Sequence, residues 1–259
     1  LHRAYLGQKR FSLEGTDMMV PMLDTAIEES AKTGGQEIVI GMAHRGRLNV
    51  LAHILGVSYR ELLEGFEDKP LRDTSLSIPR QGTGDVKYHH GAEVPVRLPG
   101  GARATVTLVP NPSHLEFVNP VVLGLARAKQ ISGPGKETVQ EVNAAVPVLI
   151  HGDAAFAAEG IVAETLNLAR LEGYSTGGTL HILANNQVGF TAEPSESRST
   201  RYASDLAKGY DVPVLHVNAD DPEACLASVR LAMAYRARFH SDVVLDLIGY
   251  RRHGHNEGD

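Results

Sequence analysis

The chain has 259 residues, of which 42% are hydrophobic and 22% charged, and its formal net charge is −6 at pH 7. This composition supports a substantial apolar core in one large α/β domain or two smaller ones, and the lack of a basic surplus argues against nucleic acid and anionic membranes as partners. No stretch reaches the roughly 18 consecutive apolar residues of a membrane span, and the single cysteine, Cys225, fits a reducing compartment.

Short apolar runs predict strands, and segments with a helical spacing of apolar residues lie between them. The predicted strands are residues 37–42, 104–109, 146–150, 180–184, 212–217 and 243–248. The predicted helices are residues 17–32, 48–55, 59–66, 115–130, 156–171 and 222–239. Continuous apolar strands that alternate with helices are typical of a doubly wound, mostly parallel sheet of the α/β class.

Helix ends and loop composition add detail to this pattern. Asp221 can cap the last predicted helix, and Pro222 occupies its first turn. Two long stretches, 68–101 and 189–201, are rich in glycine, proline, serine and arginine. Loops of this length in a compact domain are usually functional or mobile.

Polar side chains follow the first predicted strand at its carboxyl end. His44 and Arg45 come directly after it, with Arg47 close behind. One interpretation makes His44 a buried core histidine and the arginines a solvated basic turn. The other uses the fact that guanidinium is the usual partner in bidentate phosphate recognition, and a strand end is where a phosphate would bind. The residues alone leave both open.

Two further segments carry candidate side chains. The stretch from Gly82 to Gly91 contains the adjacent histidines His89 and His90, but it is not a dinucleotide fingerprint, because no strand leads into it. Ser113 lies between a predicted strand and a predicted helix. It can cap that helix, and this structural role is at least as well supported as a catalytic one.

Asp153 and Asn186 follow two consecutive predicted strands, with the predicted helix 156–171 as the crossover between them. In such a βαβ unit the strands are parallel, so both side chains emerge at the carboxyl edge, where open α/β sheets bind ligands. A carboxylate, a carboxamide and backbone carbonyls suit Mg²⁺, and the N–H groups of a helix beginning near Ala155 suit phosphates. Alternatively, Asp153 caps the helix and Asn185-Asn186 forms a turn. The pattern outlines a magnesium–diphosphate site.

Two histidines, His253 and His255, flank a glycine just after the last predicted strand. Their spacing permits zinc binding. With only two candidate ligands nearby, however, a zinc site is poorly supported.

Several longer segments surround the Asp153 and Asn186 motifs in a fixed order. They are Met42-Ala-His-Arg-Gly-Arg-Leu-Asn49, Gly82-Thr-Gly-Asp-Val-Lys-Tyr-His89, Asn111-Pro-Ser-His-Leu-Glu116 and Tyr250-Arg-Arg-His-Gly-His-Asn-Glu257. The central pair resembles the thiamine diphosphate signature, Gly-Asp-Gly followed further along by Asn-Asn, with Ala154 in place of the third glycine. Together, from about Lys9 to Asp259, the segments resemble the decarboxylating, first component of the 2-oxoglutarate dehydrogenase complex, in which Gly-Asp-Ala-Ala is the usual form.

The resemblance implies a thiamine diphosphate-binding fold and a role for individual residues. The expected catalytic residues are His44, which would face the reacting carbon, His89, which would contact the substrate, and Ser113. The expected metal ligands are Asp153, Asn186 and the backbone carbonyl of Val188. The expected cofactor contacts are Arg45, Ser113, Leu115, Asp153, Ala154, Ala155, Asn186, Val188 and His255.

The remaining polar residues of these segments receive other roles or none. We expect Arg47 to be structural and His90 to lie at the surface. His114 and His253 stay without an assigned role.

The resemblance also implies the reaction and its partners. With thiamine diphosphate and Mg²⁺, the protein would decarboxylate 2-oxoglutarate in the tricarboxylic acid cycle and pass the succinyl group to a lipoyl-bearing succinyltransferase, alongside dihydrolipoyl dehydrogenase. A homodimer in the bacterial cytoplasm is expected, with the mitochondrial matrix as the alternative. A 2-oxoadipate dehydrogenase and a non-catalytic scaffold are the competing functions, and a transketolase fits less well.

Residues 1–259 would form the domain that binds the diphosphate and Mg²⁺, as a fragment of a longer chain. The pyrimidine-binding and C-terminal domains would then be absent. Since the glutamate that activates the aminopyrimidine lies in a later domain of this family, the fragment alone is expected to be inactive.

Overall fold

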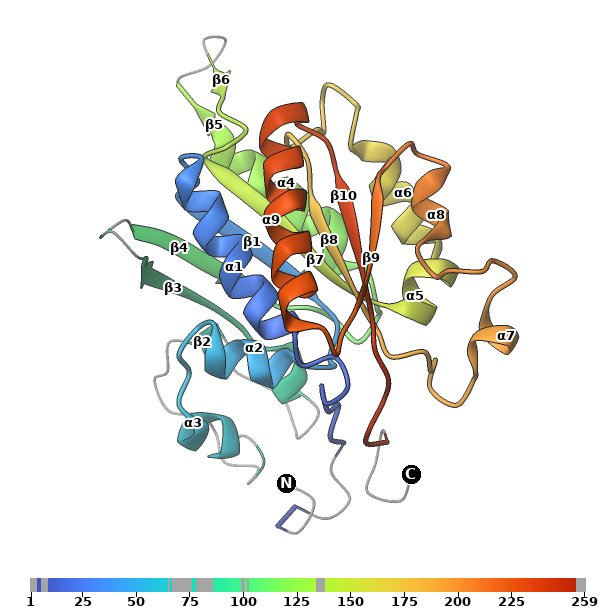
Figure 1. Cartoon of the computed structure of the whole chain (residues 1–259). Helices are drawn as coiled ribbons and strands as arrows, with labels where there is room; N and C mark the ends of the chain where they lie inside the picture. The colour runs from blue at the N-terminus through green and yellow to red at the C-terminus, as the bar shows by residue number, and fades with distance from the viewer. Residues whose placement is uncertain are drawn as a thin grey trace.

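A computed structural model of the chain describes residues 4–5, 9–64, 66, 76–77, 86–98, 101, 103–133 and 138–254. Within these ranges the main sheet has eight strands in the order β2-β3-β4-β1-β7-β8-β10-β9 (Figure 1). The strands are β1 Glu37–Met42, β2 Leu76–Ser77, β3 Gly91–Arg97, β4 Arg103–Leu108, β7 Ala145–Gly152, β8 Leu180–Asn185, β9 Val214–Asn218 and β10 Val243–Ile248. A separate hairpin joins β5 Ile131–Ser132 and β6 Val139–Gln140.

From β4 to β9 all neighbouring strands are parallel, whereas β3 and β2 are antiparallel additions at one edge. The central parallel strands β1, β7, β8 and β10 are almost wholly buried, as expected of a sheet that is covered on both faces, whereas the edge strand β9 is only partly buried.

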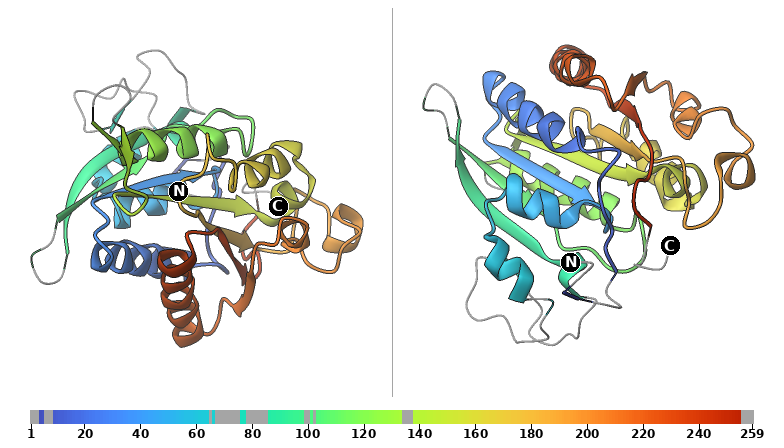
Figure 2. Two further views of the ribbon diagram at one scale, coloured as in Figure 1. Left: turned by 90° about the horizontal axis from the view of Figure 1, so that it is seen from above. Right: turned by 60° about the horizontal axis from the view of Figure 1, so that its bottom comes forward.

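Helices cover both faces of the sheet (Figure 2). On one face, α1 Met19–Lys32, α2 Arg47–His53 and α9 Pro222–Phe239 enclose the larger apolar core. On the other, α4 Val118–Gln130, α5 Asp153–Ala158, α6 Gly160–Leu168 and α8 Asp205–Lys208 enclose two smaller clusters. Two short helices, α3 Tyr59–Glu64 and α7 Pro194–Ser197, lie in the connections. The predicted doubly wound, mostly parallel α/β sheet is therefore confirmed.

Most predicted elements are confirmed, with boundaries that shift by a few residues. The strands 37–42 and 243–248 and the helix 222–239 have the predicted bounds. Asp221 caps that helix by accepting a hydrogen bond from the Ala224 N–H, as expected. In the part of the chain that the structure describes, no helix combines the length and the apolar character needed to span a membrane.

Three predictions about elements are wrong. The crossover helix 156–171 is two helices, α5 and α6, because Glu159 is extended (φ −82°, ψ 116°). The helix expected from residue 115 begins at Val118, since Glu116 has φ +67°, which no residue of a right-handed helix adopts. Residues 91–97, predicted as part of a loop, form strand β3. Much of that predicted loop, 68–75, 78–85 and 99–100, lies outside the described residues.

Candidate active site

A cavity of about 460 Å³ opens at the carboxyl edge of the sheet. Its walls come from the segments that follow β1, β7 and β8. The chain leaves β1 toward β4 on one side, then returns past β1 to β7 and continues to β8 on the other. The winding direction therefore reverses between β1 and β7, and this switch point is where open α/β sheets form ligand crevices.

The segment after β1 contributes His44 and Arg45 to the cavity. Gly46 makes the following turn possible. Its φ is +79°, and a Cβ atom there would lie 2.8 Å from the Leu13 side chain. This turn directs Arg47 inward, where it donates to the backbone carbonyls of His90, Met42 and Val109. Arg47 is fully buried and structural, as expected.

His44 lies against His89, with 2.9 Å between their Nε2 atoms. The contact requires one ring to donate a proton and the other to accept it. His44 also stacks on Phe11, with 5.3 Å between ring centroids. The two candidate catalytic imidazoles thus form one half-buried pair, of which His44 lines the cavity and His89 does not.

Two guanidinium groups line the same cavity, from Arg45 and Arg251. Arg45 donates to the Ser12 carbonyl at 2.6 Å, and Arg251 donates to the Phe190 carbonyl at 2.7 Å. Burial, with a smaller effect of Arg251, lowers the pKa of Arg45 to about 10, so the side chain stays a cation at neutral pH. Two cations at one cavity make it suited to an anion.

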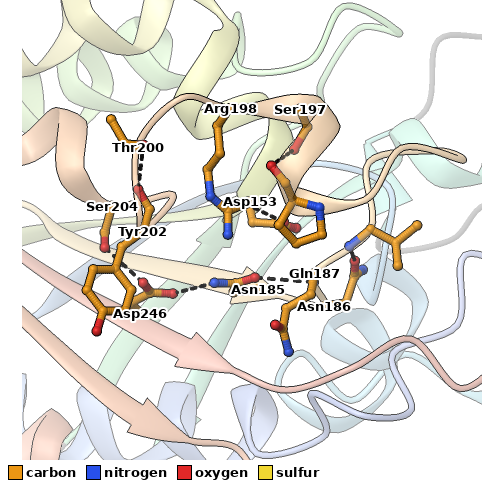
Figure 3. Close-up of polar contacts among 12 residues, drawn as sticks. Asp153, Asn185, Asn186, Gln187, Ser197, Arg198, Thr200, Tyr202, Ser204 and Asp246 are labelled. Carbon is orange, nitrogen blue, oxygen red and sulfur yellow. Dashed lines mark hydrogen bonds and ion pairs between the residues drawn. The ribbon is translucent and has the colours of Figure 1, made fainter.

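Asp153 begins α5 and is 3% exposed. Its Oδ2 lies 3.6 Å from Nη1 of Arg198, whose side chain is also buried (Figure 3). Burial raises the pKa of the Asp153 carboxyl, and Arg198 opposes this shift only in part. Gly152 is the N-cap residue of α5 and Asp153 is the first residue of its first turn, so Asp153 does not occupy the cap position itself.

Ala154 and Ala155 line the cavity beside Asp153 with small side chains. The β8 loop approaches them closely: a Cβ atom at Gly189 would lie 2.7 Å from the Ala154 Cβ. The absence of a side chain at Gly189 therefore allows the loops after β7 and β8 to approach each other closely.

The turn after β8 presents Asn186 and Val188 to the cavity. Asn185 Oδ1 accepts from the Gln187 N–H at 3.2 Å, and Asn186 Oδ1 accepts from the Val188 N–H at 3.1 Å. The expected Asx turn is therefore present. It leaves the second lone pair of the Asn186 oxygen for another partner.

The loop before α4 carries Ser113 and Leu115, and only Leu115 lines the cavity. Ser113 is exposed. It is not the helix cap, because α4 begins five residues later with Phe117 as its N-cap residue. The prediction of Ser113 as a cap is wrong.

A buried chain of four titratable side chains anchors this loop to the sheet. Glu116 Oε2 lies 2.6 Å from His151 Nδ1, His151 Nε2 lies 3.0 Å from His181 Nδ1, and His181 Nε2 lies 3.2 Å from Asp242 Oδ2. Burial lowers the pKa of His181. These four side chains extend from His151, which lines the cavity, to Asp242, which directly precedes the amino end of β10.

The remaining histidines are dispersed. His90, expected at the surface, is 5% exposed, so that prediction is wrong; its backbone carbonyl supports Arg47. Burial, with smaller effects of Arg47 and His89, lowers the pKa of His90 to about 4. His114 is exposed beside Phe117, and His253 lies 3.9 Å from Glu14. His255 lies outside the described residues.

Sequence reasoning missed several residues that line the cavity: Phe11, His151, Glu159, Phe190 and Arg251. Arg251 and His151 lie inside the motifs and could have been considered there. Phe11 gave no signal, because its place beside His44 depends on the course of the N-terminal segment. Among the described residues, no group of three or more His, Cys, Asp or Glu side chains could hold a metal ion.

Comparison with known proteins gives consistent matches. A family model described as "Dehydrogenase E1 component" matches residues 1–259. The chain is 56% identical over 265 residues to the "2-oxoglutarate dehydrogenase E1 component" of Bacillus pumilus (strain SAFR-032) and 55% identical over 265 residues to that of Bacillus subtilis (strain 168). The protein of that name from Geobacillus kaustophilus (strain HTA426) is 56% identical over 266 residues. Each match covers 100% of this chain but only 28% of the relative.

Proposed function

Because the chain belongs to the dehydrogenase E1 component family, we propose that it is the diphosphate- and metal-binding domain of a 2-oxoglutarate dehydrogenase that depends on thiamine diphosphate and Mg²⁺. The observation that carries the proposal is the single cavity at the switch point. It gathers His44, Arg45, Asp153 and Asn186 from three separate strand ends, and His44 in turn contacts His89.

The residues at the cavity fit a magnesium diphosphate. Asp153 is a buried carboxylate whose nearest cation, Arg198, lies 3.6 Å away, so a divalent ion would supply the missing opposite charge. Asp153, Asn186 and the Val188 carbonyl form a set of hard oxygen donors, the kind that Mg²⁺ prefers. Arg45 supplies a cation for the phosphates.

In this proposal each residue has a defined task. Asp153, Asn186 and the Val188 carbonyl hold Mg²⁺. Arg45, the backbone N–H groups of Ala154 and Ala155, and His255 bind the diphosphate. Leu115 forms an apolar wall that keeps water from the reacting part of the cofactor.

When bound, thiamine diphosphate supplies the electron sink for the loss of CO₂ from a 2-oxo acid. The protein's own contribution is to place the substrate and to hold protons. His89 binds the substrate, and His44 shares a proton with it through their 2.9 Å contact at the cavity wall. Ser113 is the least supported of the proposed catalytic residues, since its exposed side chain does not line the cavity.

The proposed substrate is 2-oxoglutarate, with succinyl transfer to a lipoyl-bearing partner in a multienzyme complex that includes dihydrolipoyl dehydrogenase, in the tricarboxylic acid cycle. The chain spans 28% of the length of its relatives, and we propose that the remainder supplies the pyrimidine-binding and C-terminal domains and the contacts of a homodimer. The bacterial relatives support a cytoplasmic location. The competing functions are a 2-oxoadipate dehydrogenase and a non-catalytic scaffold.

Decarboxylation by the full-length protein tests the proposal. CO₂ release is measured with 2-oxoglutarate, 2-oxoadipate and pyruvate, each with thiamine diphosphate and Mg²⁺. We expect the highest kcat/KM with 2-oxoglutarate. A preference for 2-oxoadipate would replace the substrate assignment, and no release with any of the three would favour the scaffold.

A further inference from the structure

A second buried carboxylate, Asp246, lies behind the cavity without lining it. Asp246 is in β10, is 0% exposed, lies opposite His216 of β9 and is hydrogen-bonded to Asn185 of β8. Its Oδ1 accepts from Asn185 Nδ2 at 2.9 Å, its Oδ2 accepts from Ser204 Oγ at 2.8 Å, and His216 Nδ1 lies 3.1 Å from Oδ2. Figure 3 shows Asp246 joined to Asn185 and Ser204. A carboxylate in the middle of three donors acts only as an acceptor.

This acceptor fixes the orientation of the Asn185 amide. Nδ2 of Asn185 must face Asp246, because only the amide nitrogen can donate. Oδ1 must then face the opposite way, where it accepts from the Gln187 N–H at 3.2 Å. If the amide were flipped, two acceptors would face each other at Asp246 and two donors would face each other at Gln187. One orientation alone satisfies both contacts.

The contact to Gln187 closes the turn that carries Asn186 and Val188. Gln187 has φ +60°, a left-handed conformation that costs free energy for a residue other than glycine. The Asn185 oxygen and the bond from Gln187 Nε2 to the Gly249 carbonyl, at 2.7 Å, hold this conformation. Two of the three proposed metal-binding groups therefore depend on the Asn185 amide.

Asp246 also holds the segment on the other side of Asp153. Ser204 ends the stretch that begins at Arg198, whose guanidinium lies beside Asp153 (Figure 3). One buried carboxylate thus ties together the Asn185–Val188 turn and the Arg198–Ser204 segment.

We propose that Asp246 is a positioning residue of the metal–diphosphate site, which sets the geometry of the Asn186 and Val188 ligands by fixing the orientation of the Asn185 amide. The inference rests on the proposed function, because it concerns the same site. It differs from a general contribution to stability in that the effect passes through a single hydrogen-bond orientation.

Because one amide orientation satisfies both contacts, the effects of substitutions at Asp246 and Asn185 follow from the donors and acceptors that they provide. In Asp246→Asn, an amide replaces the acceptor. Either its NH₂ group faces the Asn185 NH₂ group, or Asn185 flips and its NH₂ group faces the Gln187 N–H. In the exchanged pair, Asn185→Asp with Asp246→Asn, every contact can form again: Asp at 185 accepts from both the new amide and Gln187, and the Asn oxygen at 246 accepts from Ser204 and His216.

Asp242 offers a matched control. It is also a nearly buried carboxylate, 4% exposed, adjoining the same strands at their opposite ends. It accepts from the Thr179 N–H at 2.7 Å and faces His181. Asp242→Asn removes a buried acceptor of the same kind that contacts no cavity-lining residue directly, since His181 separates it from His151.

The test is thiamine diphosphate binding to the full-length apo-protein, measured by calorimetry over a series of Mg²⁺ concentrations, together with the thermal midpoint of each variant. Substitution of residues that orient metal ligands typically weakens metal affinity roughly ten- to hundredfold. We expect a loss of that size for Asp246→Asn, recovery of most of it in the exchanged pair, and unchanged affinity with a lowered midpoint for Asp242→Asn.

The contrary outcomes are distinct. Unchanged affinity in Asp246→Asn, or equal losses in Asp246→Asn and Asp242→Asn, would overturn the inference, and so would an exchanged pair that folds without regaining affinity. If Asp246→Asn does not fold, the cofactor affinity of the exchanged pair tests the inference without it. Asp153→Ala separates the two proposals: if it too keeps full affinity, the proposed function fails, and if it alone loses affinity, only the role of Asp246 fails.

Discussion

His89 and Arg45 are proposed to bind different molecules, the substrate and the cofactor respectively. His89→Ala in the full-length protein should lower turnover of 2-oxoglutarate while cofactor affinity changes little. Arg45→Ala should weaken cofactor binding by about 1.5–3 kcal/mol, the usual contribution of a hydrogen bond to a charged group. Steady-state kinetics and calorimetry distinguish the two. Equal losses of cofactor affinity in both variants would show that the division of roles is wrong.

A buried histidine should make stability depend on pH. The pKa of His90 falls from an ordinary 6.5 to about 4 because of burial. Between pH 4 and pH 6.5 the unfolded chain binds a proton at His90 that the folded chain does not. The contribution of the neutral His90 to the free energy of unfolding is therefore complete above pH 6.5 and is lost as the pH falls toward 4. His90→Gln should therefore show a smaller loss of thermal midpoint between pH 7 and pH 5 than the wild type does.

The exposed His114 provides the control for this measurement. His114→Gln should leave the pH dependence as it is in the wild type. If the thermal midpoint of His90→Gln fell as much between pH 7 and pH 5 as that of the wild type, the contribution assigned to His90 would be wrong. Part of the slope should persist in His90→Gln, because burial also lowers the pKa of His181.

At the residue scale, the sequence indicates those site residues whose chemistry and position in a motif agree. Asp153 and Asn186 follow strands, and both line the cavity. Phe11 and Asp246 could not be found in this way. Phe11 belongs to an N-terminal segment that is distant in sequence from the other cavity residues. Asp246 lies inside an apolar strand, and its partners depend on the strand order. His90 was misplaced because nothing in its neighbours indicates that Arg47 packs beneath it.

Helix α9 offers a test at the scale of one element. Asp221 caps it through a hydrogen bond of 3.0 Å from the Ala224 N–H. Asp221→Ala should cost about 0.5–2 kcal/mol, the usual effect of losing an N-cap side chain. Hydrogen exchange should show faster exchange in the first turn of α9 and little change elsewhere, whereas Asp221→Ser should keep most of the protection. Unchanged exchange in that turn would contradict the capping role.

Elements with a continuous apolar pattern were predictable, and those set by tertiary contacts were not. Strand β3 was missed because Pro95 interrupts its alternating pattern, although proline is tolerated near a sheet edge. The break between α5 and α6 lies at the extended backbone of Glu159, next to Gly160, a poor helix former in a segment whose apolar spacing otherwise favours a helix. Left-handed Glu116 delays α4 for a similar reason: its carboxylate is held by His151 from the sheet.

For the whole molecule, the alternation of strands and helices predicts the fold class but not the strand order. The position of β1 between β4 and β7 creates the switch point, and this order brings His44 and Arg45 to the same cavity as Asp153. The motifs indicated which residues to compare. Only the three-dimensional arrangement shows that His44, Arg45 and Asp153 line one cavity.

The share of the relatives that the chain covers leads to a prediction about activity. We propose that residues 1–259 are a half-site, because the groups that orient the aminopyrimidine would come from the rest of the protein. The isolated 259-residue chain should then release no CO₂ from 2-oxoglutarate, while the full-length protein does. Robust decarboxylation by residues 1–259 alone would mean that the activating acid lies among the carboxylates of this chain.

Asp153 and Asn186 are proposed to bind the metal of a magnesium diphosphate, and the decisive measurement is calorimetric titration of thiamine diphosphate into the full-length protein. The titration is made with Mg²⁺ and with a chelator, for the wild type, Asp153→Ala and Asn186→Ala. We expect metal-dependent binding in the wild type, its loss in Asp153→Ala with the fold intact by circular dichroism, and a smaller loss in Asn186→Ala, whose missing ligand is neutral. Metal-dependent binding of wild-type affinity in Asp153→Ala would show that Asp153 is not a ligand of the metal.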